Sequence, residues 1–113
     1  MNFGFFRVAA AVPDKVDIAY SAGNAARIIE IVRRAAAEGV RVVVFPELSV
    51  TGYTCGDLLR MPKLADDAER ALSEIADATA ALPVAAIVGM PVRVVDRLYN
   101  CAVVVGGGNV WGA

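Results

Sequence analysis

Short apolar runs recur along the chain, and each ends at residues that favour turns, a pattern that predicts buried strands. The clearest runs are Phe5–Val12, Arg41–Phe45 and Val84–Met90. Pro13 follows the first run and Pro46 follows the second. Because proline cannot donate a hydrogen bond to a β-ladder, we expect both strands to end there.

The last part of the chain predicts two further strands, Val92–Val95 and Tyr99–Val105, joined at Asp96-Arg97. Gly106–Asn109 has the composition of a tight turn, after which another element begins at Val110. No predicted helix follows these glycines to supply an N-terminal phosphate site. We therefore interpret them as a hairpin turn and not as a phosphate-binding loop.

Between the strands, apolar residues repeat twice with the spacing of an amphipathic helix. Ser21 is a candidate N-cap for the first helix, and Gly39 is placed for a left-handed C-terminal cap. Gly56–Arg60 predicts a short helical turn. Pro62 suits the first turn of the second helix, which should end before Pro83. The predicted apolar faces are Ala25, Ile28, Ile29, Val32, Ala35 and Ala36, then Leu64, Ala68, Ala71, Leu72, Ile75 and Thr79.

The order strand, helix, strand, helix, strand predicts an α/β fold in which helices flank a sheet. A length of 113 residues suits one small domain, and neither a repeat nor a linker divides residues 1–113. Functional residues in such sheets gather beyond the carboxyl ends of the strands. Glu47 lies at such an end, as do Asp14 and the region of Pro91.

Glu47 stands in the most informative stretch of the chain, Val43–Leu59, at the end of an apolar run. A carboxylate that leaves such a strand loses hydration, which favours its protonated form and suits a general base near neutral pH. Alternatively, Glu47 caps a surface turn after Pro46. Periodicity alone does not separate these two interpretations.

Composition excludes several classes of function. Eleven basic and twelve acidic residues leave a net charge of -1 without a basic cluster, which argues against a nucleic-acid surface. The chain has no histidine, which removes Ser-His-Asp and Cys-His catalysis and histidine-based metal sites, and we predict no metal site. The longest apolar stretch, Ala80–Val92, is too short and too interrupted by proline and glycine to span a bilayer.

The two cysteines, Cys55 and Cys101, form neither a CxxC pair nor a disulfide framework. Reduced thiols favour the cytoplasm, and we expect no targeting segment. Cys55 precedes the predicted helical turn, where a thiol is sometimes activated. It belongs to the loop after Glu47, however, and we do not assign it as a nucleophile. Cys101 lies among valines and is interpreted as a small buried apolar residue.

The segment Phe45–Tyr53, FPELSVTGY, resembles the glutamate motif of the nitrilase or carbon-nitrogen hydrolase superfamily. Within that superfamily, the following TCGDLL resembles the glutaminase domains of glutamine-dependent NAD(+) synthetases. Three further segments agree with it: GFFRVAAAVP, NAARIIEIVRRAAAEGVRVVVFPE and VGMPVRVVDRLYNCAVVV. The resemblance covers essentially all 113 residues. It implies a four-layer α-β-β-α sandwich, of which this chain forms part.

The resemblance also implies a triad of glutamate, lysine and cysteine that hydrolyses the side-chain amide of glutamine. Glu47 matches the glutamate. Tyr53 matches a tyrosine that lines the substrate pocket, although a loop anchor over the sheet is an equally good interpretation. Gly52 is assigned to loop geometry. Lys15 and Lys63 do not match the lysine motif; the triad lysine and cysteine would lie beyond this chain, which we expect to be inactive alone.

Several partners follow from the same resemblance. Glutamine would be the substrate, and ammonia would pass to a synthetase domain absent from this chain, where ATP and Mg²⁺ activate nicotinic acid adenine dinucleotide. The intact enzyme would be a homo-oligomer, without a nucleic-acid or membrane partner and without a cofactor in this segment. We expect the isolated chain to expose an apolar sheet face and to associate, to be poorly soluble or to depend on other segments. Two alternatives remain, a stand-alone amidase of the superfamily and a non-catalytic α/β interaction module.

Overall fold

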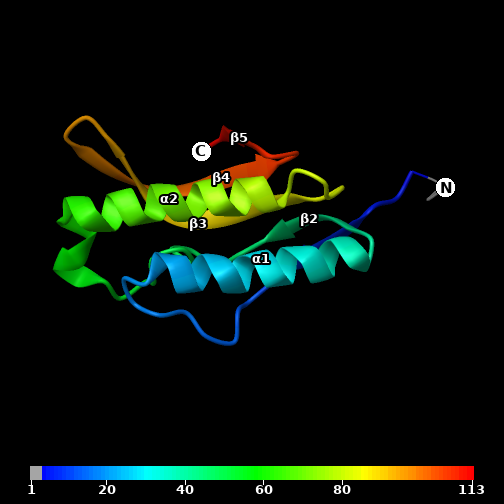
Figure 1. The fold of residues 1–113 in the computed structure, drawn as a ribbon, viewed down its shortest axis with the longest axis horizontal. Helices are drawn as coiled ribbons and strands as arrows, with labels where there is room; N and C mark the ends of the chain where they lie inside the picture. The colour runs from blue at the N-terminus through cyan, green and yellow to red at the C-terminus, as the bar shows by residue number, and fades with distance from the viewer. Residues whose placement is uncertain (1–3) are drawn as a thin grey trace.

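The computed structural model describes residues 4–113, which form a five-stranded sheet and two long helices (Figure 1). In the order of the sheet, the strands are β1 (Arg7–Ala10), β2 (Val40–Val44), β3 (Ala85–Val94), β4 (Arg97–Gly106) and β5 (Asn109–Gly112). Strands β1, β2 and β3 are parallel, whereas β4 runs antiparallel to both of its neighbours. The helices are α1 (Ser21–Ala37) and α2 (Pro62–Ala78), and the 3₁₀ turn η1 (Gly56–Arg60) precedes α2. The predicted α/β class is confirmed.

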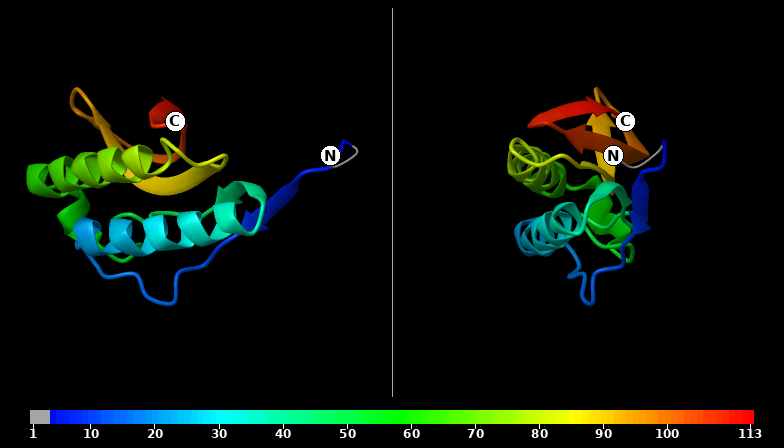
Figure 2. Two further views of the ribbon diagram at one scale, coloured as in Figure 1. Left: turned by 45° about the vertical axis from the view of Figure 1, so that its right-hand side comes forward. Right: turned by 90° about the vertical axis from the view of Figure 1, so that its right-hand side faces the viewer.

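The two helices lie side by side on one face of the sheet (Figure 2). This placement follows from the chain order, because β1, β2 and β3 succeed one another in one direction across the sheet. Crossovers between parallel strands are almost always right-handed, so α1 and α2 fall on the same side. The described chain therefore has two layers, one of helices and one of strands.

The core fills the space between these two layers. Residues that alternate along β2, β3 and β4 point toward the helices and are buried: Val43, Ala86, Val88, Met90, Val103 and Val105. The helices contribute the residues predicted from periodicity, of which Ile29, Ala36 and Leu72 are half-buried and the others are buried: Ala25, Ile28, Val32, Ala35, Leu64, Ala68, Ala71, Ile75 and Thr79. Both predicted apolar faces are confirmed.

The opposite face of the sheet is largely open. Val8 is paired in register with Val42, and both share this face with Val44. Val8 is 61% exposed and Val44 is 41% exposed, because no other described element packs over them. The prediction of a buried strand over Phe5–Val12 is therefore wrong in length and in burial: β1 is a four-residue edge strand, in which mainly Ala9 packs against the core.

Three of the four predicted helix boundaries are confirmed, including the end of α2 at Ala78, before Pro83. Gly39 adopts φ +81° just past α1, the left-handed geometry that glycine accepts without a steric cost. Pro62 lies in the first turn of α2. The N-cap prediction is wrong, because Tyr20 occupies that position and Ser21 is the first helical residue. The Ser21 hydroxyl is buried and has no hydrogen-bond partner among the described residues.

The segment 84–95 forms one strand, β3, and not the two that were predicted. The carbonyl of Ile87 and the backbone of Gly89 bond toward the β2 side. Because backbone polar groups alternate in direction along a strand, Pro91 also faces the β2 side. The missing N–H of Pro91 therefore interrupts no ladder bond to β4. It interrupts none to β2 either, because the last β2–β3 pair is Val44 with Ile87.

A tight hairpin joins β4 to β5, as predicted for Gly106–Asn109. Gly107 and Gly108 both have positive φ, +57° and +82°, the requirement of a type I′ turn. Within residues 4–113, neither helix combines the length and the apolar character that crossing a membrane requires.

Candidate active site

Glu47 stands just beyond β2, at the carboxyl edge of the parallel strands. The N–H of Phe45 donates to the carbonyl of Ile87 at 2.9 Å, which extends the β2–β3 ladder by one residue before Pro46 ends it. Glu47 then begins a turn. Its side chain is exposed, so the loss of hydration expected from the sequence is not found in the described chain. Its assignment as a general base stays a prediction.

The turn that carries Glu47 is held on β3 at Gly89. The Gly89 N–H donates to Ser49 Oγ at 3.3 Å, and the Val50 N–H donates to the Gly89 carbonyl at 3.1 Å. A Cβ at position 89 would overlap the backbone of Pro46 and Leu48, so the turn lies where only glycine leaves room. Leu48 itself has φ +53°, a strained conformation for leucine. Sequence reasoning singled out neither Gly89 nor Leu48.

Asn24 fixes the segment that carries Glu47 at its far end, Val50; we call this segment the Glu47 loop. This α1 residue is only 2% exposed, and its amide donates to the carbonyls of Val50 at 2.9 Å and Asp17 at 2.7 Å. Its Oδ1 accepts from the Asp17 N–H at 2.8 Å. One buried amide thus ties the Glu47 loop and the 11–20 connection to α1. A polar residue on the apolar face of a predicted helix was the available signal, because buried amides are almost always hydrogen-bonded.

An ion pair extends this network to the surface. Arg27 Nη2 contacts Asp17 Oδ2 at 2.9 Å, and Arg27 Nη1 also donates to Asn24 Oδ1 at 3.2 Å. The hydrogen bond from Arg27 is the largest influence on Asp17 and lowers the pKa of that carboxyl below its usual value of 3.8. Partial burial opposes this effect, and Lys15 adds to it.

The carboxylate of Glu47 borders a shallow pocket of about 290 Å³, lined by 44–45, Glu47, 87–89 and 100–102. The amide nitrogen of Asn100, on β4, donates a hydrogen bond to Glu47 Oε1. This contact joins two positions that are 53 residues apart. Sequence reasoning missed Asn100, although asparagine is disfavoured in strands and is the polar exception in LYNCAVVV.

The other candidate residues lie apart from this contact. Tyr53 is 66% exposed and does not line the pocket beside Glu47; its binding role stays a prediction. Gly52 has φ +91°, which agrees with a role in loop geometry. Cys55 is buried, with Sγ 3.1 Å from the carbonyls of Thr51 and Gly52. Cys101 is half-buried, not buried as predicted, and it packs against the core on the helix side of the sheet.

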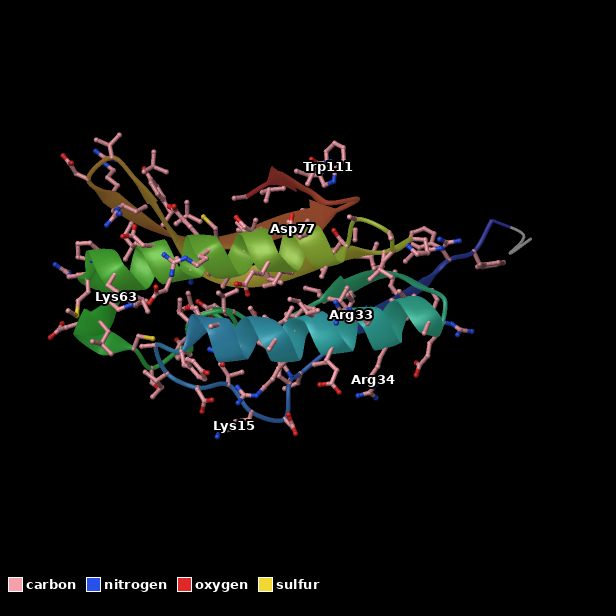
Figure 3. All side chains as sticks on the ribbon, in the orientation of Figure 1. Lys15, Arg33, Arg34, Lys63, Asp77 and Trp111 are labelled. Atoms are coloured by element: carbon pink, nitrogen blue, oxygen red, sulfur yellow. The ribbon has the colours of Figure 1, made fainter. Side chains whose placement is uncertain are left out.

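Neither lysine approaches a catalytic arrangement. Lys15 Nζ contacts Asp17 Oδ1 at 3.4 Å, and Lys63 Nζ contacts Asp67 Oδ2 at 3.0 Å on the surface of α2 (Figure 3). Across the described part of the chain, no three histidine, cysteine, aspartate or glutamate side chains gather where they would hold a metal ion.

A larger hollow, of about 530 Å³, lies between β1 and α1. It is lined by residues 9–12, which are three alanines and a valine, and by opposite charges that include Arg27, Glu30 and Arg34. These charges largely neutralise one another, and the hollow contains no nucleophilic side chain. We therefore place the candidate site at the smaller pocket beside Glu47.

The sequence of this chain is similar to known proteins of one family. Residues 8–112 match the family described as Carbon-nitrogen hydrolase. The chain is 38% identical, over 118 aligned positions, to the glutamine-dependent NAD(+) synthetase of Mycobacterium tuberculosis, covering 99% of this chain and 17% of that protein. It is also 38% identical, over 107 positions, to the synthetase of the same name from Xylella fastidiosa, covering 94% of this chain and 19% of that protein.

Solved structures give the same result. The fold matches a glutamine-dependent NAD(+) synthetase from Cytophaga hutchinsonii with a TM-score of 0.84 and 28% identity, over 93% of this chain and 18% of that one. An amidase from Nesterenkonia shares the fold at a TM-score of 0.77 and 20% identity, over 95% of this chain and 41% of that one. These matches confirm the resemblance drawn from Phe45–Tyr53 and the predicted fold class. The chain therefore belongs to the carbon-nitrogen hydrolase family.

Proposed function

We propose that this chain supplies the glutamate of a glutamine-hydrolysing site in a glutamine-dependent NAD(+) synthetase. The observation that carries the proposal is the position of Glu47, at the carboxyl edge of the parallel strands, beside an open pocket and held by a side-chain donor. Membership of the family and the relatives described above support it. The chain spans 17% of the length of the mycobacterial relative, so the activity of the whole protein belongs to this proposal.

In the proposed reaction, the Glu47 carboxylate accepts the proton of a cysteine thiol. The sulfur then attacks the amide carbon of glutamine. A lysine stabilises the anionic intermediate, and the proton held by Glu47 leaves with ammonia. Water, deprotonated by Glu47, then attacks the thioester. The C–S bond breaks, the proton returns from Glu47 to the sulfur, and glutamate is released. The lysine and cysteine would come from sequence beyond these 113 residues, and the isolated chain would be inactive.

The synthetase assignment is favoured over a stand-alone amidase for a specific reason. The mycobacterial and Xylella relatives share 38% identity with this chain and are glutamine-dependent NAD(+) synthetases. The Nesterenkonia amidase is only 20% identical, which supports a common fold and not a common substrate. We therefore propose that ammonia released at this site is used in ATP- and Mg²⁺-dependent NAD synthesis by another domain, in the cytoplasm.

The proposal is tested with the complete gene product that contains this chain. Glu47→Gln removes the base while keeping the shape of the side chain, and glutamine-dependent ammonia release should fall at least about 100-fold. NAD synthesis from added free ammonia should persist, because it bypasses the glutaminase site. Glu69→Gln, on the exposed surface of α2, is the matched control and should leave both rates unchanged.

Other outcomes would overturn the proposal. Undiminished ammonia release by Glu47→Gln would remove Glu47 as the base. Hydrolysis of small amides without hydrolysis of glutamine would favour an amidase, and no hydrolysis by the wild-type gene product would favour an interaction module. Ammonia release by the isolated 113-residue chain would contradict its proposed inactivity.

We further propose that the open sheet face is covered in the intact protein and that this protein is a homo-oligomer. Val8 and Val44 form part of an apolar surface on that face, a kind of surface that favours association. Analytical ultracentrifugation of the gene product would measure its assembly. A monomer across the micromolar range would contradict the oligomer.

A further inference from the structure

We propose that Asn100 is a positioning residue, which orients the Glu47 carboxylate for proton transfer. This inference deepens the proposed function and rests on it. Its basis is the hydrogen bond from Asn100 Nδ2 to Glu47 Oε1, the one side-chain hydrogen bond that Glu47 makes within the described residues.

The sheet brings Asn100 to Glu47 by its register. Asn100 is paired with Pro91, and two residues further along β4, Ala102 is paired with Gly89. Paired residues, and residues two apart on one strand, share a face of a sheet. Asn100 is therefore on the same face as Gly89, against which the Glu47 turn is packed. The turn and β4 thus meet over β3, and the two side chains extend toward each other.

The exposure of Glu47 gives this contact its importance. An exposed glutamate side chain samples several rotamers, and ordering it carries an entropic cost. The hydrogen bond to Oε1 selects one orientation before substrate binds. It leaves Oε2 available to accept a proton, because a carboxylate offers acceptor sites on both oxygens.

The chemical type of the donor matters as well. The amide of Asn100 is neutral and stays uncharged throughout the pH range of enzyme assays. It orients the carboxylate without competing for the proton that Glu47 must accept and return. A lysine or arginine at this position would bind the carboxylate as an ion pair and hold it in its charged form. Asparagine suits a group that must change protonation during a reaction.

The experiment compares glutaminase kinetics of the complete gene product with those of Asn100→Leu and Asn100→Ala. One replacement fills the position and the other empties it, and neither can donate. We expect kcat for glutamine hydrolysis to fall about 10- to 100-fold in both, with KM changed less than threefold, because a misoriented base slows proton transfer more than substrate binding. Asn109→Leu, on the neighbouring hairpin, is the matched control and should retain wild-type kcat.

A double-mutant cycle distinguishes positioning from a structural role. If Asn100 acts through Glu47, adding Asn100→Leu to Glu47→Gln should cause no further fall in the residual rate. An additional 10-fold fall in that background, an unchanged kcat in Asn100→Leu, or a loss confined to KM would each overturn the inference. Global unfolding of a variant is excluded if it makes NAD from free ammonia at the wild-type rate and has the circular dichroism spectrum of the wild type. Should Glu47→Gln retain full activity, the proposed function itself fails, independently of what Asn100 does.

Discussion

The backbone of Leu48 packs directly against Gly89 of β3. The turn that carries Glu47 lies in the space that a side chain at position 89 would occupy. The contact is with backbone, which cannot move aside as a flexible side chain can. Two hydrogen bonds hold the turn in this position, one to Ser49 Oγ and one from the Val50 N–H. The position of Glu47 is thus set by a residue that has no side chain.

Gly89→Ala should therefore displace the Glu47 turn. We expect a loss of about 1–3 kcal/mol in the free energy of unfolding, the usual cost of forcing a methyl group into a packed site. Glutamine hydrolysis by the complete gene product should fall at least about 10-fold, because Glu47 shifts. Gly106→Ala is the matched strand control, since its added Cβ would meet Ala85 at an ordinary 3.6 Å. Equal stability of both variants would contradict the close contact at Gly89.

Asn24→Ala should loosen the same loop from the side of α1. The change leaves the buried Val50 carbonyl and the partly buried Asp17 carbonyl without their donor, which we expect to cost about 3 kcal/mol. Hydrogen exchange should accelerate at the Asp17 amide, which donates to Asn24 Oδ1. Chemical denaturation at a low, fixed protein concentration measures the stability. The exposed Asn109→Ala serves as control, and a loss below about 1 kcal/mol for Asn24→Ala would contradict the network.

Ser21→Ala separates the predicted N-cap from the observed buried hydroxyl by the sign of its effect. Loss of an N-cap would destabilise the chain by about 1 kcal/mol. Removing a buried hydroxyl that has no partner among the described residues should instead stabilise it by about 1 kcal/mol. Ser73→Ala, on the exposed face of α2, corrects for the higher helix propensity of alanine. Destabilisation by Ser21→Ala beyond that control would restore the N-cap.

The elements and the core were predictable because they depend on patterns within short segments. The helical faces that contain Ile28 and Ile75 follow from a period of 3.6 residues, and Gly39 and Pro62 mark helix ends by their backbone chemistry. The errors concern neighbours that a local pattern does not contain. A run such as Phe5–Val12 is typical of a buried strand, but burial depends on what covers each face of the sheet, and β1 is covered on one face only.

The candidate site was predictable only in part, for a related reason. Glu47 was identifiable at the end of an apolar strand, whereas its partners come from distant positions. Asn100 reaches it through the β3–β4 register, and Gly89 matters because the turn happens to cross there. Register is set by the pairing of whole strands, and joining Val84–Met90 to Val92–Val95 through Pro91 changes which residues lie opposite each other. A prediction that separates these strands at Pro91 loses the pairing that leads to Asn100.

The Asp17–Arg27 pair should give the chain an acid-sensitive contribution to stability. The pKa of Asp17 is lowered in the folded state, chiefly by the hydrogen bond from Arg27. A carboxyl with a lowered folded pKa stabilises the fold above its unfolded pKa, near 3.8, and the contribution is lost as the pH falls through the folded value. Denaturation between about pH 6 and pH 2.5 should therefore show Arg27→Gln less stable than wild type at pH 6, with the difference shrinking below about pH 4. Arg33→Gln, on the exposed face of the same helix, should show no such convergence (Figure 3). A stability difference for Arg27→Gln that stayed constant across this range would mean that Arg27 acts through its contact with Asn24 and not through the charge of Asp17.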